Sequence, residues 1–163
     1  MKHLILFTLI VFLVYGTKTE AEMNEDEAQK VWEEYHSRIL SRRLFEAEKI
    51  IQEIAKISNS EENDVILDFE FFSDLNGKPE LLVEQLSENY EMSLGAKDEK
   101  GYISISGTTR PYSYKFSAAN IRDWVEFMHE VALSYGTIFS NWELTIPTLK
   151  KTYVSKTIET PYD

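Results

Sequence analysis

The sequence predicts an α+β protein in which helices cover one face of an antiparallel sheet. Three observations predict this class. Apolar residues recur at helical spacing from about residue 24 to residue 57. After residue 64, short segments of alternating apolar and polar residues predict four strands. Two more helical segments separate these strands, so the order from residue 65 is strand, helix, strand, strand, helix, strand.

The pattern of apolar residues in the N-terminal segment, residues 22–58, predicts a long helix. Asn24 is a suitable N-cap, and the acidic residues after it suit the positive end of the helix dipole. The apolar stripe shifts by one position beside residues 41–43, which predicts one curved helix or two helices that meet there. We expect this stripe to pack on the following domain, because a coiled coil needs several regular heptads. The solvent-facing residues are expected to be Glu33, Glu34, Arg38, Arg42, Glu46 and Lys49.

The four strands are predicted over residues 65–72, 90–95, 102–109 and 139–146. Pro79 suits the first position of the helix between the first two strands. Residues 98–101 predict a hairpin turn between the second and third strands. Ser117 is the expected N-cap of the second helix, and Gly136 is the glycine expected to end it.

Two right-handed crossovers fold this order into a four-stranded antiparallel sheet with both helices on one face. This arrangement is the ferredoxin-like βαββαβ sandwich, and we predict it for residues 65–146. The other face of the sheet is left uncovered unless the long N-terminal helix lies on it. Residues 147–163 predict a loose, polar C-terminal tail, in which residues 152–158 offer an alternative edge strand.

The first 21 residues have the layout of a secretory signal peptide. Lys2 supplies a positive charge, residues 4–15 form an apolar core, and Thr19 and Ala21 are small residues at a cleavage site. We therefore expect a periplasmic or secreted protein, cleaved after Ala21 and without stable membrane insertion thereafter. The alternative is an uncleaved membrane anchor, although an apolar run of 12 residues is short for about 30 Å of hydrocarbon.

The amino-acid composition excludes several classes of functional site and partner. The chain has no cysteine, which excludes disulfides, thiol catalysis and cysteine-based metal sites. Cleavage after Ala21 removes Lys2, Lys18 and Glu20, which leaves 15 basic and 27 acidic residues and a net charge of −12. Such an acidic protein disfavours nucleic acid as a partner and favours proteins with basic surfaces.

Three stretches in the second half of the chain occur in a recognisable order. They are the strand 68–72 (DFEFF), the segment 101–110 (GYISISGTTR), and the helix end 132–136 (ALSYG) followed by 140–143 (SNWE). Together these stretches resemble the domain of the regulator of ribonuclease activity B (RraB) family, over about half of the chain. The last stretch departs from the family pattern, which has Asp-Gly in place of Ser140-Asn141 and Gly in place of Glu143.

The resemblance implies a non-enzymatic, protein-binding domain. The regulator that gives the family its name binds and inhibits an RNA-degrading endonuclease in the cytosol, which an exported relative would not meet. We therefore expect an exported regulatory domain that binds a different protein. The alternative is a cytosolic regulator of RNA degradation, if the N-terminal segment is not a cleaved signal.

One pair of carboxylates is the main candidate for chemistry. Asp68 and Glu70 alternate with apolar residues, so they lie about 7 Å apart on the open face of the predicted sheet. Paired carboxylates can perform acid–base catalysis or bind a divalent cation, which would suit a small envelope enzyme. A hydrated acidic face or a protein-binding face is the simpler interpretation. Other residues expected on this face are Ser104, Ser106, Asn141 and Glu143.

Aromatic residues supply candidate contacts for a protein partner. Phe72 and Tyr102 are expected to flank the acidic face. Trp32 and Tyr35 are the best candidates on the N-terminal helix, if that helix protrudes. The predicted protein-binding residues are therefore Asp68, Glu70, Phe72, Tyr102, Glu143, Trp32 and Tyr35.

No residue pattern predicts a cofactor or a metal ion. His36 and His129 each lie beside glutamates on a helix, which is typical of solvated surface groups. No serine is spaced to pair with either histidine, and the six glycines form no phosphate-binding loop. Trp124 and Trp142 are expected in the core. We therefore expect a protein without catalytic activity, cofactor or metal.

Overall fold

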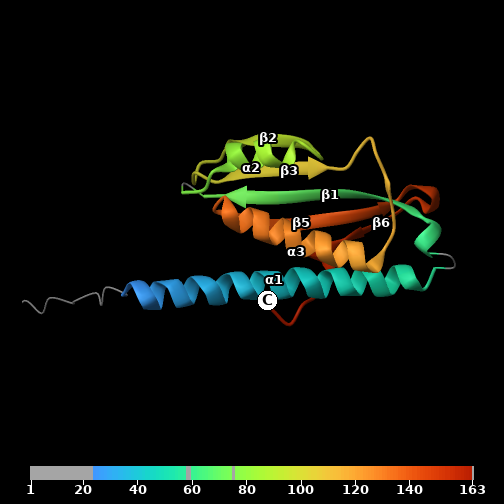
Figure 1. The fold of residues 1–163 in the computed structure, drawn as a ribbon, viewed down its shortest axis with the longest axis horizontal. Coiled ribbons are helices and arrows are strands. Elements are labelled where there is room, and N and C mark those ends of the chain that lie inside the picture. The colour runs from blue at the N-terminus through green and yellow to red at the C-terminus, as the bar shows by residue number, and fades with distance from the viewer. Residues whose placement is uncertain (1–23, 58–59, 75, 163) are drawn as a thin grey trace, which may run out of the picture.

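The computed structural model of the chain describes residues 24–57, 60–74 and 76–162. It is an α+β structure with a long N-terminal helix and an open antiparallel sheet of six strands (Figure 1). The expected signal peptide lies outside the described residues. In the part of the chain that is described, no helix combines the length and the apolar character needed to cross a membrane.

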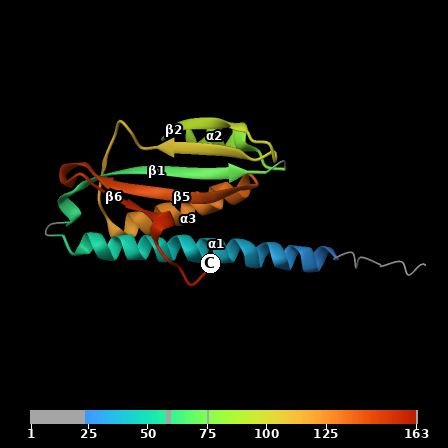
Figure 2. The same ribbon diagram turned by 180° about the vertical axis from the view of Figure 1, so that it is seen from behind.

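The N-terminal helix α1 spans Glu25–Ala55, 31 residues without a break. Asn24 caps it as predicted, because the Asn24 side chain accepts a hydrogen bond from the backbone N–H of Glu27 at 2.8 Å. The helix passes through residues 41–43 as one element. It packs on α3 (Ala118–Ser134) and leaves the other face of the sheet open at Asp68 and Glu70, while its N-terminal half lies beside Phe72 and Ile138 at one end of the sheet (Figures 1 and 2).

The two halves of α1 differ in burial. The C-terminal half buries Ala47, Ile50 and Ile54, which confirms that this part of the stripe packs on the domain. In the N-terminal half, Val31 is 55% exposed and Trp32 is 49% exposed. The first turns of α1 extend past the end of the sheet (Figure 1).

Glu46 corrects the expected solvent face of α1. Its side chain is fully buried, at 0% exposure. Arg43 Nη1 lies 2.6 Å from one Glu46 carboxylate oxygen, and Arg42 Nε lies 3.1 Å from the other. The prediction is wrong here because two arginines on the same helix compensate the buried charge.

The sheet contains the four predicted strands in antiparallel pairs. They are β1 (Asp64–Ser73), β2 (Glu91–Lys97), β3 (Ile103–Thr108) and β5 (Thr137–Ile146). Their order across the sheet is β2-β3-β1-β5, and β6 follows at the edge. Helix α2 (Pro79–Leu86) joins β1 to β2, and α3 precedes β5.

The predicted ends of both helices are confirmed. Pro79 opens α2. Ser117 caps α3, because its hydroxyl oxygen accepts a hydrogen bond from the backbone N–H of Asn120 at 3.4 Å. Gly136 follows the end of α3 with φ +64°, a left-handed conformation that glycine adopts without strain.

Two further strands extend the sheet beyond the four predicted. β4 (Tyr114–Lys115) pairs with the start of β1, and β6 (Lys151–Val154) pairs with β5. The C-terminal segment is therefore part of the fold: the expected loose tail is wrong here, and the alternative edge strand over residues 152–158 is confirmed in part by β6. A short 3₁₀ helix, η3 (Ser155–Thr157), continues it, and the buried Ser155 hydroxyl accepts a hydrogen bond from the backbone N–H of Trp142 at 3.0 Å. Two other 3₁₀ helices are η1 (Ser60–Glu62) and η2 (Pro147–Leu149).

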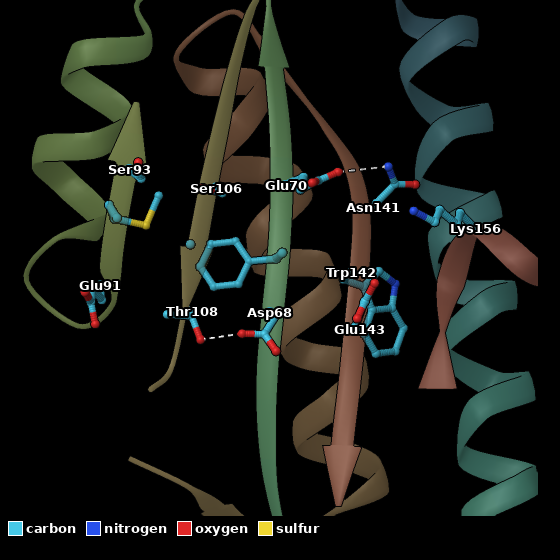
Figure 3. Close-up of a pocket in the computed structure, with 13 residues that line it drawn as sticks. Asp68, Glu70, Glu91, Ser93, Ser106, Thr108, Asn141, Trp142, Glu143 and Lys156 are labelled. Atoms are coloured by element: carbon cyan, nitrogen blue, oxygen red, sulfur yellow. Dashed lines mark hydrogen bonds between the residues drawn. The ribbon is translucent and has the colours of Figure 1, made fainter. Parts of the chain in front are cut away.

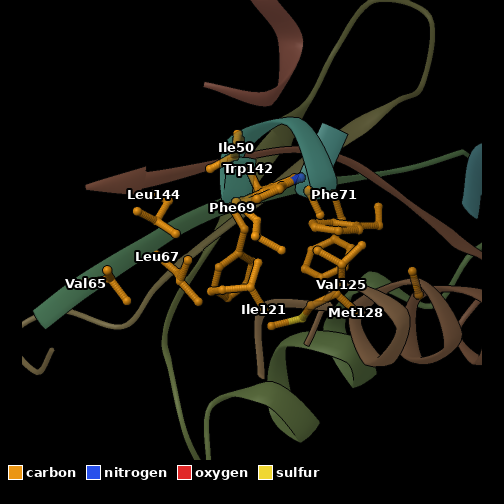
Figure 4. Packing of buried hydrophobic residues seen from close by; sticks show 14 of the residues in the cluster. Ile50, Val65, Leu67, Phe69, Phe71, Ile121, Val125, Met128, Trp142 and Leu144 are labelled. Carbon is orange, nitrogen blue, oxygen red and sulfur yellow. The ribbon is translucent and has the colours of Figure 1, made fainter. Parts of the chain in front are cut away.

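The core lies between the sheet and the helices (Figure 4). Alternation along β1 turns Val65, Leu67, Phe69 and Phe71 inward, as predicted. Aromatic rings meet edge to face there, with the Phe69 and Trp124 ring centroids 5.7 Å apart. Trp142 is 1% exposed and Trp124 is half-buried, so the core prediction is confirmed for Trp142 and holds for Trp124 only at the rim.

Candidate functional site

A hollow of about 420 Å³ lies over the open face of the sheet (Figure 3). The described residues that line it belong to β1, β2, β3 and β5, with Lys156 from η3, and none belongs to α1, α2 or α3. Alternation explains its chemistry, because Asp68 and Glu70 point to the open side while Phe69 and Phe71 point to the core. We call this surface the acidic face.

Strand register arranges the acidic face into two rows across the sheet. The first row runs Glu91, Thr108, Asp68, Glu143. The second row runs Ser93, Ser106, Glu70, Asn141. Five residues predicted on this face therefore line one hollow: Asp68, Glu70, Ser106, Asn141 and Glu143.

Two details of this face differ from the sequence prediction. Ser104 lies on β3 but does not line the hollow. Glu91 does line it, and sequence reasoning missed it. Glu91 alternates with the apolar Met92, which indicates that the two side chains point to opposite faces of the sheet. Placing Glu91 in the hollow also requires the register of β2 against β3, which pairs Glu91 with Thr108.

Asp68 is the most strongly engaged carboxylate of the acidic face. The Thr108 hydroxyl donates a hydrogen bond to Asp68 Oδ1 at 2.5 Å. The Arg110 guanidinium contacts both carboxylate oxygens, through Nη2 at 3.0 Å and Nε at 3.3 Å. This two-pronged contact fixes the Asp68 side chain and compensates its charge. The Asp68 side chain is therefore held in one place on the acidic face by its neighbours.

Glu70 has a weaker, neutral partner. Asn141 Nδ2 donates a hydrogen bond to Glu70 Oε2 at 3.2 Å (Figure 3). The pairing of β1 with β5 shifts beside Glu70, where Ser140 is the extra residue of a β-bulge. Such bulges redirect side chains locally and are common beside functional sites. Glu70 has no ion-pair partner among the described residues, so its charge is not compensated within this face.

The predicted aromatic residues gather at a different place from the acidic face. A groove of about 550 Å³ lies between α1 and the end of the sheet. The Trp32 and Tyr35 rings have centroids 6.2 Å apart, and the Phe72 and Tyr102 rings also lie 6.2 Å apart, edge to face. We call this surface the aromatic groove; it is lined by Trp32, Tyr35, Phe72, Asp74, Tyr102, Gly136, Thr137 and Ile138.

Local structure explains how this groove forms. Phe72 lies near the end of β1, and Tyr102 lies directly before β3, which pairs with that end. Asp98 Oδ1 accepts a hydrogen bond from the backbone N–H of Tyr102 at 2.8 Å, which holds the hairpin turn beside it. Gly136 lies close to Gly77, and a side chain on Gly77 would collide with the Gly136 carbonyl oxygen. The two predicted aromatic pairs therefore meet because α1 passes this end of the sheet.

The two helical histidines are buried, so the prediction that they are solvated is wrong. His36 on α1 and His129 on α3 are each 6% exposed, and their ring centroids lie 6.0 Å apart. Burial lowers the pKa of both imidazoles from the ordinary value of 6.5, and for His129 the neighbouring His36 and Arg43 lower the pKa further, against Glu130. Packing of α1 on α3 brings the two side chains together, and no spacing in the sequence indicates it.

Among the described residues, no group of three or more histidine, aspartate or glutamate side chains is placed to hold a metal ion. In comparisons with known proteins, no protein-family model matches the sequence, and no curated protein matches it. The candidate site therefore consists of the acidic face and the aromatic groove beside it.

Proposed function

We propose that this chain is a non-enzymatic protein-interaction domain, which binds a partner with a basic surface on its acidic face. One observation carries the proposal: three carboxylates lie in one row across this face, and among the described residues only one of them has an ion-pair partner. Asp68 on β1 faces Glu143 on β5, with Glu91 at the other end of the same row. Arg110 compensates the charge of Asp68, so the uncompensated charges of this row are those of Glu91 and Glu143, and a basic partner would supply the counter-charge that they lack.

The balance of charge on the acidic face supports the proposal. Four carboxylates line the hollow against one lysine, Lys156. Arg110 compensates Asp68, but Glu91 and Glu143 have no ion-pair partner among the described residues. Complementary charge speeds association and selects the correct partner. The net charge of the whole chain, −11, acts in the same direction.

The test begins with the partner that the purified protein captures from its own cellular compartment. The dissociation constant for that partner is then measured for the wild type and for Glu70→Lys combined with Glu143→Lys. We expect the double variant to bind at least about tenfold more weakly, because two attractive contacts become repulsive. Its unfolding free energy should stay within about 0.5 kcal/mol of the wild type, because both residues are on the surface.

A matched control reverses two charges on the helical side instead. Glu84 and Glu126 are exposed on α2 and α3, so Glu84→Lys combined with Glu126→Lys changes the net charge by the same amount. This control should bind the partner with nearly wild-type affinity. Equal losses in both double variants would show a general charge effect, and unchanged binding in Glu70→Lys with Glu143→Lys would reject the acidic face.

We also propose that β1, β2, β3 and β5 with α2 and α3 form a ferredoxin-like unit related to the RraB family. The strand order β2-β3-β1-β5 supports the unit, since it is the order that two right-handed crossovers give. The three stretches that resemble the family fall on β1, on the β3 segment, and on the end of α3 with β5. The regulatory role is part of the proposal, and the target is a protein other than the cytosolic endonuclease.

Export is the remaining part of this proposal, and it is tested separately. Mass spectrometry of the protein from fractionated cells should find an N-terminus at Glu22, outside the cytosol. A full-length chain in the cytosol would instead favour the alternative function, inhibition of an RNA-degrading enzyme.

A further inference from the structure

The aromatic groove adjoins a second hollow of opposite character. This second hollow, of about 450 Å³, lies along α1 and includes Arg38, Arg42 and Arg43 in its lining. The two hollows share Tyr35 and Phe72, together with Ile138. Aromatic rings with a carboxylate therefore lie at one end of a continuous surface, and guanidinium groups lie at the other.

The aromatic end has the features of a site for an organic cation. Four rings line it, and two of them remain open to solvent, with Trp32 49% exposed and Tyr102 45% exposed. The faces of such rings attract cations, and tryptophan does so most strongly. Asp74 adds a negative charge; its Oδ1 accepts a hydrogen bond from the backbone N–H of Asn76 at 2.8 Å, and it has no ion-pair partner among the described residues.

Asp74 is the single carboxylate among the described residues that line this end, which favours a quaternary ammonium over a lysine or arginine side chain. An ammonium or guanidinium group carries several N–H donors, each of which loses water on binding and needs a new acceptor. The remaining side-chain oxygens in the lining are hydroxyls. Those of Tyr35 and Tyr102 are on the rings, and that of Thr137 is buried and donates to the carbonyl of Ala132 at 3.1 Å. A quaternary ammonium has no N–H group, so the rings and Asp74 satisfy it.

Arg38 supplies the opposite charge at the junction of the two hollows. Its guanidinium carbon lies 5.9 Å from the centroid of the Tyr35 ring, which lines both hollows. Arg38 is exposed, whereas Arg42 and Arg43 bind the buried Glu46. A guanidinium matches the geometry of a phosphate oxygen pair. Arg38 is therefore the arginine best placed to hold an anionic group beside the aromatic groove.

We propose that the aromatic groove binds a small, soluble zwitterion of the phosphocholine class. The trimethylammonium group lies against Trp32 and Tyr102 near Asp74, and the phosphate reaches Arg38. A soluble ligand is favoured over a membrane headgroup, because three acidic residues open α1 near this end and the chain is acidic overall. This ligand site goes beyond the protein-binding function proposed above, and does not depend on it.

The test is a calorimetric titration of the purified protein with phosphocholine and, separately, with choline. We expect saturable binding of phosphocholine and weaker binding of choline. Trp32→Ala should lower the affinity for both ligands about tenfold, because it removes a ring from the cationic end. Arg38→Gln should lower the affinity for phosphocholine about fivefold to tenfold and leave choline unchanged, because choline has no phosphate.

Controls separate this site from nonspecific effects and from the acidic face. Tyr112 is 71% exposed and does not line the groove, so Tyr112→Ala should bind like the wild type. Glu70→Lys with Glu143→Lys should also keep phosphocholine binding, even though it loses the protein partner. Absence of saturable binding would overturn the proposal, as would equal binding of 3,3-dimethyl-1-butanol, the uncharged analogue of choline. Co-sedimentation with phosphatidylcholine vesicles, without binding of free phosphocholine, would overturn the assignment to a soluble ligand.

Discussion

The two faces of the sheet are built from alternating residues of the same strands, and they differ in almost every property. On β1, Phe69 and Phe71 are 2% and 1% exposed and pack under the helices. Their neighbours Asp68 and Glu70 face a hollow that is lined by none of α1, α2 and α3. The covered face buries apolar area, which stabilises the fold. The open face gathers four carboxylates, of which only Asp68 has an ion-pair partner among the described residues.

This difference separates residues that fold the protein from residues that are free to serve binding. A face that only needed to be hydrated would be served as well by mixed charges, which attract one another across strands. The acidic face instead has four carboxylates and one lysine in its lining. Substitutions on neighbouring positions of one strand should therefore have opposite effects on stability and on binding.

The largest expected effect on stability comes from removing a large buried side chain from the covered face of the sheet. Phe71→Ala should lower the unfolding free energy by about 3–5 kcal/mol, because it leaves a cavity where the Phe71 ring meets the Phe139 ring at 5.4 Å. Phe72→Ala, the next residue, should cost only about 1 kcal/mol, since Phe72 is half-buried at the groove. Chemical denaturation of both variants measures the difference. Similar losses would show that the two faces are not energetically distinct.

A smaller effect is expected from adding one methyl group to the covered face. A side-chain carbon on Gly107 would lie 2.3 Å from the Phe69 ring and 2.6 Å from the Met92 sulfur. Gly107→Ala should therefore cost about 1–3 kcal/mol through overpacking. The matched control is Ser106→Ala, on the exposed neighbouring position of β3, which should change the unfolding free energy by less than about 0.5 kcal/mol. If thermal unfolding is the same for both variants, the close packing at Gly107 does not constrain the fold.

A gradual loss of stability is expected as the pH is lowered, because the helical side of the sheet contains two buried histidines. His36 and His129 have pKa values lowered by burial, so the folded protein binds fewer protons than the unfolded chain below pH 6.5. Stability should be constant well above that pH and should fall as the pH drops through 6.5 toward the folded pKa values. The groups that face this pair include Arg43, whose charge opposes protonation of His129, and Glu130, which favours it.

Urea midpoints measured between pH 8 and pH 5.5 check this dependence. Replacing both histidines, by His36→Gln with His129→Gln, should flatten the profile in that interval. A variant profile as steep as that of the wild type would assign the pH dependence to other groups.

The sequence predicted those features that depend on local chemistry. Alternation along residues 65–72 gave both faces of β1, because side chains in a strand point to opposite sides with a period of two. Asn24, Pro79 and Ser117 marked helix starts correctly, because capping depends on residues within one turn. Most of the acidic face followed from the same alternation once the strand order was assumed.

The features that were missed depend on how distant segments meet. Helical spacing indicated that α1 has an apolar stripe, but it did not show that α1 docks on α3 and passes the end of the sheet. That docking buries His36 against His129 and brings Trp32 and Tyr35 to Phe72 and Tyr102. β4 has only two residues, too few for a local pattern to indicate a strand, whereas β6 falls partly within the edge strand offered as an alternative over residues 152–158.

The most direct test of the central claim is a map of the partner's footprint on the protein by backbone amide chemical shifts. Addition of the captured partner should move the signals of Ser106, Asn141 and Glu143, and leave those of α2 and the exposed side of α3 in place. Shifts confined to the helices, with the signals of the acidic face unchanged, would contradict the proposal that the open face of the sheet is the binding surface.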